Sequence, residues 1–94
     1  MLVSIDHLKL NKEGCLKAFV DITFSNDLRV NGCRIIQEPG KAAWLAAPQI
    51  EWIDDTGKKR YRPLVRLPKD WHEAAQTAAL AALREATGEV KGNE

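Results

Sequence analysis

The sequence predicts an α+β fold, in which an antiparallel β-sheet is followed by one C-terminal α-helix packed on the sheet. Two observations support this: β-prone segments fill the chain up to Pro68, and helical periodicity appears only after it. Strands first and a helix last are typical of this fold class. The 94 residues, 45% hydrophobic and 29% charged, suit a single domain. We expect the domain to span residues 1–88, with a disordered tail over residues 89–94.

The clearest strand runs from Leu16 to Phe24, where apolar residues occupy every second position. The turn sequence SND at 25–27 joins it to a second β-prone segment, Leu28 to Ile36, which predicts a hairpin. A weaker strand, Leu2 to Leu10, precedes them across NKEG at 11–14. Together these segments predict a three-stranded meander.

Two further extended elements follow the meander. The apolar run AAWLA at 43–47 ends at Pro48 and predicts a fourth strand. The turn sequence DDTGK at 54–58 then separates QIEWI at 49–53 from KRYRPLV at 59–65. Because both flanks look extended, we predict a second hairpin here.

Helical periodicity predicts an α-helix from about residue 71 to residue 87, because small apolar residues recur at helical spacing. Asp70 and Glu73 fit an Asp-x-x-Glu capping arrangement at its start. Arg84 falls in the last turn, where the helix dipole favours a cation, and Gly88 suits the residue that ends the helix. One helix covers little sheet, so the bare side would need another subunit or a ligand.

A basic segment lies within the second predicted hairpin and the residues after it. No acid occurs between residues 58 and 69, although the net charge of the chain is only +1. If residues 59–66 are extended, alternate side chains face alternate sides of the strand. Arginine suits phosphate because its planar fork donates two parallel hydrogen bonds. The segment therefore predicts a phosphate-binding stripe of Arg60, Arg62 and Arg66 on one face, with Tyr61 and Val65 on the other and with Lys58, Lys59 and Lys69 at its ends.

The same charges have a second interpretation, a solvated edge strand that is protected against sheet-to-sheet aggregation. The isoelectric point of about 7.8 lies below the values typical of a dedicated DNA-binding domain. If the stripe binds nucleic acid, we expect moderate and salt-sensitive affinity. Nothing in the residues chooses between DNA and RNA.

The order of these motifs is similar to that of a known family. The most specific stretches are LKAFVDITF at 16–24, NDLRVNGCRII at 26–36 and WLAAP at 44–48, followed by a glycine turn, a basic strand and a terminal helix. This arrangement resembles the SpoVG family, which are bacterial septation and stage V sporulation regulators. The similarity covers roughly residues 1–70.

The resemblance implies a small α+β protein that is a homodimer through its sheet, binds DNA or RNA, and acts as a regulator rather than an enzyme. Family members bind through basic residues in the later part of the chain, including the terminal helix. In this helix Arg84 is the one basic residue, with Lys69 just ahead of it. The expected phosphate-contacting residues are therefore Lys58, Lys59, Arg60, Arg62, Arg66, Lys69 and Arg84.

The cysteines and histidines do not have the spacing of a metal site. Structural zinc uses paired ligands a few residues apart, which Cys15, Cys33, His7 and His72 lack. A hairpin centred on the SND turn would place Cys33 opposite Phe19 and leave Cys15 about 13 Å along the strand, too far for a disulfide. We expect no metal, two free and half-buried cysteines, and His72 at the surface.

The three tryptophans have different expected roles. We expect Trp44 in the core or in a dimer contact, and Trp71 to pack the helix onto the sheet. Base stacking by Trp52 is disfavoured because the neighbouring acids Glu51 and Asp54 would repel a phosphate backbone.

The sequence has no nucleophile motif and no cofactor motif, so we expect no catalysis, no cofactor and no small-molecule substrate. No apolar run approaches the ~18 residues of a membrane span, and no signal peptide is evident, which predicts a cytoplasmic protein without membrane contact. Two other functions remain open. One is a protein-interaction module that pairs through an exposed sheet edge, and the other is a small enzyme of unknown chemistry.

Overall fold

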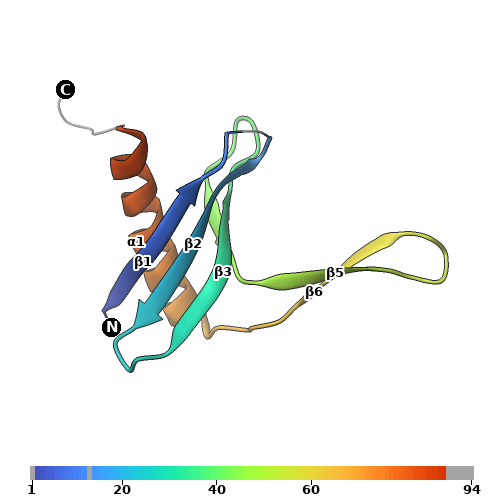
Figure 1. Cartoon of the computed structure of the whole chain (residues 1–94), viewed down its shortest axis with the longest axis horizontal. Helices are drawn as coiled ribbons and strands as arrows, with labels where there is room; N and C mark the ends of the chain where they lie inside the picture. The colour runs from blue at the N-terminus through green and yellow to red at the C-terminus, as the bar shows by residue number, and fades with distance from the viewer. Residues whose placement is uncertain (1, 13, 89–94) are drawn as a thin grey trace.

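The computed structural model describes residues 2–12 and 14–88 and confirms the predicted α+β fold (Figure 1). A four-stranded antiparallel sheet has the order β1-β2-β3-β4, and a separate two-stranded sheet pairs β5 with β6. One helix, α1, follows the strands and packs on the larger sheet. The elements are β1 Val3–Leu10, β2 Leu16–Phe24, β3 Arg29–Ile36, β4 Trp44–Ala46, β5 Gln49–Ile53, β6 Lys59–Pro63 and α1 Lys69–Thr87.

The predicted meander and fourth strand are confirmed as one sheet. Strands β1, β2 and β3 pair in sequence order, and β4 adds antiparallel to β3. The β2–β3 turn is closed by the Phe24 amide, which donates to the Leu28 carbonyl at 2.8 Å, and Asp27 adopts a φ of 68°. Aspartate tolerates this left-handed conformation better than most residues, which explains the SND turn.

A β-bulge in β3 changes the register that the turn alone would set. Near the turn Ile22 pairs with Val30, but farther along Val20 pairs with Cys33, so two residues of β3 oppose Asp21. The extra residue, Gly32, has a φ of 83°, and its amide donates to Asp21 Oδ1 at 2.9 Å. The predicted pairing of Cys33 with Phe19 is therefore wrong, because the bulge turns Cys33 from the outer face into the core.

The core lies between α1 and one face of the sheet. Its fully buried large side chains are Phe24, Ile22, Ile35, Leu45, Val20 and Cys33. The helix contributes Ala75 and Ala79, whose small side chains let α1 approach the strands closely, and the Trp71 ring lies 5.0 Å from that of Phe24. The expected packing of Trp71 against the sheet is confirmed.

The other face of the sheet is left uncovered by α1. Trp44 is 45% exposed and Phe19 is 38% exposed on this side. The expected core position for Trp44 is therefore wrong, and its alternative role in a dimer contact stays a prediction.

Helix α1 begins two residues earlier than predicted. Its N-cap is Pro68, and within the described residues no side chain caps the helix start, so the expected Asp70–Glu73 capping arrangement is wrong. Asp70 instead lies in the first turn, where the helix dipole favours a negative charge. Gly88 ends the helix with a φ of 78°, as predicted. The predicted disordered tail, residues 89–94, lies outside the described residues.

Two helix side chains bind the backbone of the edge strand β4. The Leu45 amide donates to Gln76 Oε1 at 2.9 Å, and His72 Nε2 donates to the Leu45 carbonyl at 2.7 Å. His72 is thus half-buried and bonded to β4 rather than a plain surface residue. Because both groups of Leu45 are bonded, this stretch of the edge is closed to an added strand.

The second hairpin, as predicted, is formed by β5 and β6 and projects from the body of the molecule (Figure 1). We call residues 49–63 the arm. The Leu64 amide closes its base by donating to the Pro48 carbonyl at 2.9 Å. Nearly all arm residues are exposed, and the arm accounts for much of the 52 Å length of the molecule. Among the described residues, no helix has both the length and the apolar character needed to cross a membrane.

Candidate nucleic-acid interface

The pairing of β5 with β6 sorts the side chains of the arm onto two faces. Paired residues of an antiparallel ladder lie on the same face. The pairs Ile50–Arg62 and Trp52–Arg60 share one face, which we call the tryptophan face. The pairs Glu51–Tyr61 and Ile53–Lys59 share the other. The predicted placement of Arg60 and Arg62 on one face, with Tyr61 opposite, is confirmed.

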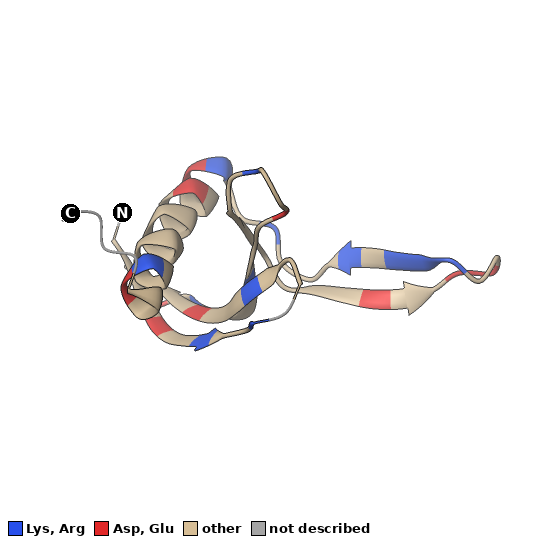
Figure 2. Cartoon of the chain, turned by 90° about the horizontal axis from the view of Figure 1, so that it is seen from above, with Lys and Arg blue, Asp and Glu red and all other residues tan. Residues whose placement is uncertain are grey.

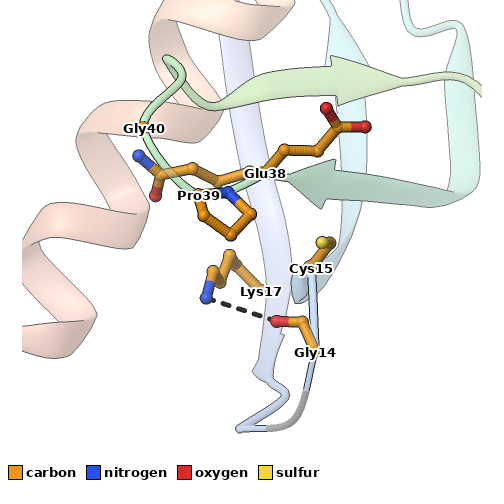
Figure 3. A pocket seen from close by; sticks show the side chains of 7 residues that line it. Gly14, Cys15, Lys17, Glu38, Pro39 and Gly40 are labelled. Carbon is orange, nitrogen blue, oxygen red and sulfur yellow. Dashed lines mark hydrogen bonds between the residues drawn. The ribbon is translucent and has the colours of Figure 1, made fainter.

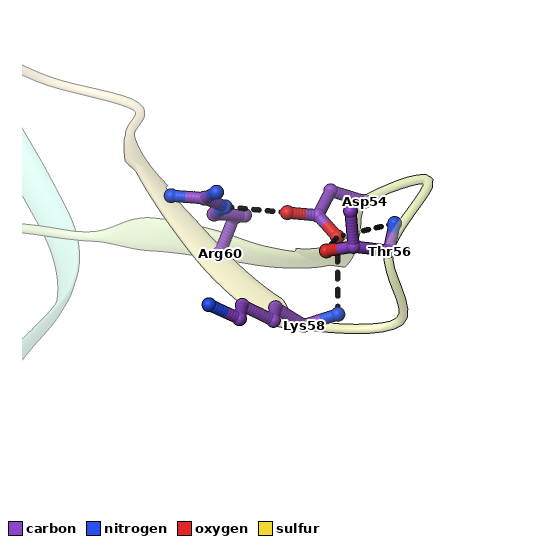
Figure 4. A network of polar contacts seen from close by, with 4 residues as sticks. All are labelled: Asp54, Thr56, Lys58 and Arg60. Atoms are coloured by element: carbon purple, nitrogen blue, oxygen red, sulfur yellow. Dashed lines mark hydrogen bonds and ion pairs between the residues drawn. The ribbon is translucent and has the colours of Figure 1, made fainter.

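Asp54 organises the tip of the arm (Figure 4). Its Oδ1 accepts hydrogen bonds from the Thr56 hydroxyl at 2.6 Å, the Thr56 amide at 2.9 Å and the Lys58 amide at 3.0 Å. Its Oδ2 accepts a charge-assisted bond from Arg60 Nε at 2.6 Å. The Thr56 hydroxyl, then Arg60 and the Lys58 amide, lower the pKa of Asp54 from 3.8 to about 2. Asp54 therefore stays ionised and holds Arg60 at neutral pH.

The basic character of the arm is partly neutralised by its own acids. Lys59 Nζ lies 3.6 Å from Glu51 Oε2 on the face opposite Trp52. In Figure 2, basic colouring covers much of β6, whereas acidic colouring marks the tip and part of β5. Over residues 49–63 there are four basic and three acidic side chains, so the net charge of the arm is +1. Fewer cations are thus available for phosphate than the sequence predicts.

Arg62 stands apart from these ion pairs and adjoins apolar side chains. Among the described residues it has no ion-pair partner. Together with Ile50 and Trp52 it lines an open pocket of about 330 Å³ on the tryptophan face. The tryptophan is 48% exposed, which leaves part of its indole ring accessible. The arrangement places an aromatic surface beside a free guanidinium.

Sequence reasoning did not assign Ile50 and Trp52 to the site. It disfavoured Trp52 because Glu51 and Asp54 are its neighbours in the sequence. In the structure Glu51 lies on the opposite face, and Asp54 is bonded to Arg60 and to the turn. Counting pairs outward from the turn at 54–58 could have placed Trp52 opposite Arg60.

The remaining predicted residues lie outside the arm itself. Arg66 follows the end of β6 at Pro63, so its predicted place on the same strand face as Arg60 and Arg62 is wrong. The chain leaves the arm there because Val65 and Leu67 pack against the core. Lys69 is the first residue of α1, and the exposed Arg84 lies in its last turn. The structure therefore brings together Lys58, Lys59, Arg60 and Arg62, but it separates Arg84 from them.

A second open pocket lies on the four-stranded sheet, between the turn before β2 and the loop after β3 (Figure 3). Lys17 Nζ points to the Gly14 carbonyl oxygen at 3.3 Å, and Glu38 binds Lys41 at 3.2 Å. Both thiols are free, and Cys15 lines this pocket. The expected half-burial is wrong for both cysteines, because Cys15 lies in an exposed turn and the bulge in β3 turns Cys33 into the core. Within residues 2–12 and 14–88, no three His, Cys, Asp or Glu side chains form a cluster that could hold a metal ion. The lining residues of this pocket include no aromatic side chain, whereas Trp52 lines the pocket beside Arg62.

Comparison of the chain with protein-family models found no match, and comparisons with curated proteins and with solved structures found none.

Proposed function

We propose that this protein is a nucleic-acid-binding regulator, similar to the SpoVG family of septation and sporulation regulators. It binds the phosphate backbone through the basic residues of its arm. One observation carries the proposal: a two-stranded ribbon projects from the body and presents the free Arg62 beside exposed apolar side chains. Such a combination suits a ligand that is both anionic and aromatic. The order of elements agrees with the sequence resemblance.

Strand β6 is an edge strand of the two-stranded ribbon, so its charges can protect the arm itself but not the main sheet. Charged edge strands protect a sheet whose open edge would otherwise pair with another chain. Strand β6 belongs to a separate two-stranded ribbon and not to the main sheet, whose β4 edge is bonded to α1 at Leu45. The basic residues therefore protect no edge of the main sheet.

The two ion pairs of the arm limit the expected electrostatic contribution. With Arg60 held by Asp54 and Lys59 near Glu51, the cations available around the arm are Lys58, Arg62 and Arg66. Each neutralised phosphate contributes about 0.7 to 0.9 to the slope of log affinity against log salt. We expect a slope of about −2 to −3.

Fluorescence anisotropy with labelled single-stranded DNA, duplex DNA and RNA, at several salt concentrations, tests the proposal. Arg62→Ala should weaken binding and reduce the salt slope by about 1, because it removes one phosphate contact. The matched control is Arg29→Ala, which removes the same charge from an exposed position of β3 outside the arm. Equal losses for the two variants, or no binding to any of the three probes at low salt, would rule out the arm as the binding site.

The uncovered face of the sheet supports the proposed homodimer. Helix α1 occupies one face only, and Phe19 and Trp44 are exposed on the other. Contact with a second copy would remove these aromatic side chains from water. We also propose a cytoplasmic location, which agrees with two free thiols.

A protein-interaction module is the second candidate function. The observation that favours it is the far face of the arm, where Ile53 and Tyr61 are more than half exposed. A protein partner could cover these side chains while the basic residues contact an acidic segment. Binding to a protein partner with little salt dependence, in the absence of nucleic-acid binding, would favour this function.

A further inference from the structure

We propose that the tryptophan face of the arm binds an unpaired base of a single-stranded nucleic acid, with the Trp52 indole stacking on the base and Arg62 contacting an adjacent phosphate. This inference rests on the proposed function and specifies its ligand. The same site would take single-stranded DNA or RNA, because every base has a flat aromatic face.

The pocket has the composition and size for one base. Ile50 and Trp52 supply an apolar floor, Arg62 lines the same pocket, and its volume of about 330 Å³ lies at the low end of small-ligand sites. Trp52 is not part of the core, so its exposed ring has no packing role in the body of the molecule. An exposed tryptophan beside a free arginine is the pairing that single-strand binding proteins use.

The neighbouring acids do not oppose a phosphate here. Glu51 lies on the other face of the ribbon, with Lys59 Nζ 3.6 Å away. Asp54 shares the tryptophan face, but its charge is offset by Arg60 at 2.6 Å and by hydrogen bonds from the turn. Arg62, which lines the same pocket as Trp52 and has no ion-pair partner among the described residues, thus supplies a positive charge beside the indole.

The chemistry of this face favours a single strand over a duplex. Bases in a duplex stack on each other and present only their edges, which proteins read with hydrogen-bonding side chains. On the tryptophan face Arg60 is occupied by Asp54, and Ile50 and Trp52 present mainly apolar surface. This surface matches the face of an unstacked base and not the edges of paired bases.

The first test uses the unaltered protein and two 12-nucleotide probes of equal charge, a thymidine oligomer and the same oligomer with abasic sites at every position. Stacking predicts quenching of tryptophan fluorescence by the thymidine oligomer, and about tenfold weaker binding of the abasic one. Equal affinity for both would overturn the stacking inference while leaving phosphate binding, and hence the proposed function, intact. No binding of either probe at low salt would overturn both.

The second test compares two tryptophan replacements. Trp52→Leu should weaken binding of the thymidine oligomer about tenfold and remove the quenching, whereas Trp52→Phe should retain most of the affinity. The matched control, Tyr61→Leu, removes an exposed aromatic ring from the opposite face of the arm and should change neither the affinity nor the quenching. Affinity and quenching that survive in Trp52→Leu but fall in Tyr61→Leu would move the stacking site to the opposite face of the arm and overturn the inference.

A uridine oligomer tests whether the sugar matters, and a duplex of the same length tests the preference for a single strand. Binding of the thymidine and uridine oligomers within a few fold of each other is expected, because stacking does not read the sugar. Tighter binding of the duplex than of either single strand would contradict the inference.

Discussion

Asp54 is the residue that decides how much of the arm's charge is available. It combines a turn-forming role, through Thr56 and Lys58, with an ion pair to Arg60. These contacts lower the pKa of Asp54 from its ordinary value of 3.8 to about 2. The stabilisation that they give is therefore fully present above pH 3.8 and is lost as the pH falls through about 2. Over the neutral range Arg60 therefore stays paired with Asp54.

Replacing Asp54 with asparagine should release Arg60 to the ligand. We expect Asp54→Asn to bind single-stranded DNA roughly threefold to tenfold more tightly at low salt and to steepen the salt slope by about 0.7, the contribution of one more phosphate. Anisotropy titrations measure both quantities. Asp55→Asn removes the same charge from the same turn without touching the Arg60 ion pair, so an equal gain in this control would contradict a specific role for Asp54.

The two cysteines should differ in reactivity. Burial, then the charge of Asp21, raises the pKa of the Cys33 thiol from 9.0 to about 11, while Cys15 is exposed. The stabilisation from burying the neutral Cys33 thiol is present below pH 9 and is lost as the pH rises through about 11. At pH 8 the native protein should react with an aromatic disulfide reagent at one thiol per chain, and at two after denaturation. Rapid reaction of two thiols in the native protein would contradict the burial of Cys33.

At the scale of the element, the bulge in β3 sets which side chains enter the core. The extra residue at Gly32 lets Val30, Cys33 and Ile35 all point toward α1, although their spacing does not follow a strict alternation. The same shift places Arg34 on the uncovered face, opposite Phe19. The bulge thus shapes both faces of the sheet.

Gly32→Ala should destabilise the protein by about 1 to 2 kcal/mol, because a φ of 83° is strained for a residue with a Cβ atom. The added methyl group would meet nothing within 4 Å, so the loss comes from the backbone and not from a clash. Urea unfolding measures the change. Gly32→Asn should lose less stability than Gly32→Ala, since asparagine tolerates this conformation. An unchanged free energy of unfolding in both variants would contradict the prediction and show that the backbone at the bulge relaxes.

At the scale of the whole molecule, two surfaces remain without a partner within the described chain. They are the bare face of the four-stranded sheet and the projecting arm (Figures 1 and 2). The two surfaces need not compete, because the arm extends away from the sheet. A homodimer through the sheet would leave both arms free for nucleic acid.

Phe19→Asp should convert the proposed dimer to a monomer, because a carboxylate would be buried without a partner in the contact. Light scattering at micromolar concentration measures the mass, and circular dichroism verifies the fold. Thr77→Asp, which adds the same charge to the exposed surface of α1, is the matched control and should remain dimeric. A monomeric mass for the unaltered protein would contradict the dimer.

The sequence by itself determined the elements and their order. Period-two alternation in residues 16–24, the SND turn, the turn at 54–58 and the helical spacing after Pro68 are local signals, and each was sufficient for its element. It also placed Arg60 and Arg62 on one face, because alternation within a strand depends only on that strand.

Only the tertiary structure decided which segments meet. The bulge at Gly32, the Asp54–Arg60 ion pair, the end of β6 at Pro63 and the bonds from His72 and Gln76 to Leu45 all involve pairing between segments or competition with the core. Local periodicity carries no information on pairing register once an extra residue enters a strand. Trp52 joined the candidate site for this reason: Glu51 lies on the other face, Asp54 is bonded to Arg60, and Arg60 and Arg62 share the face of Trp52.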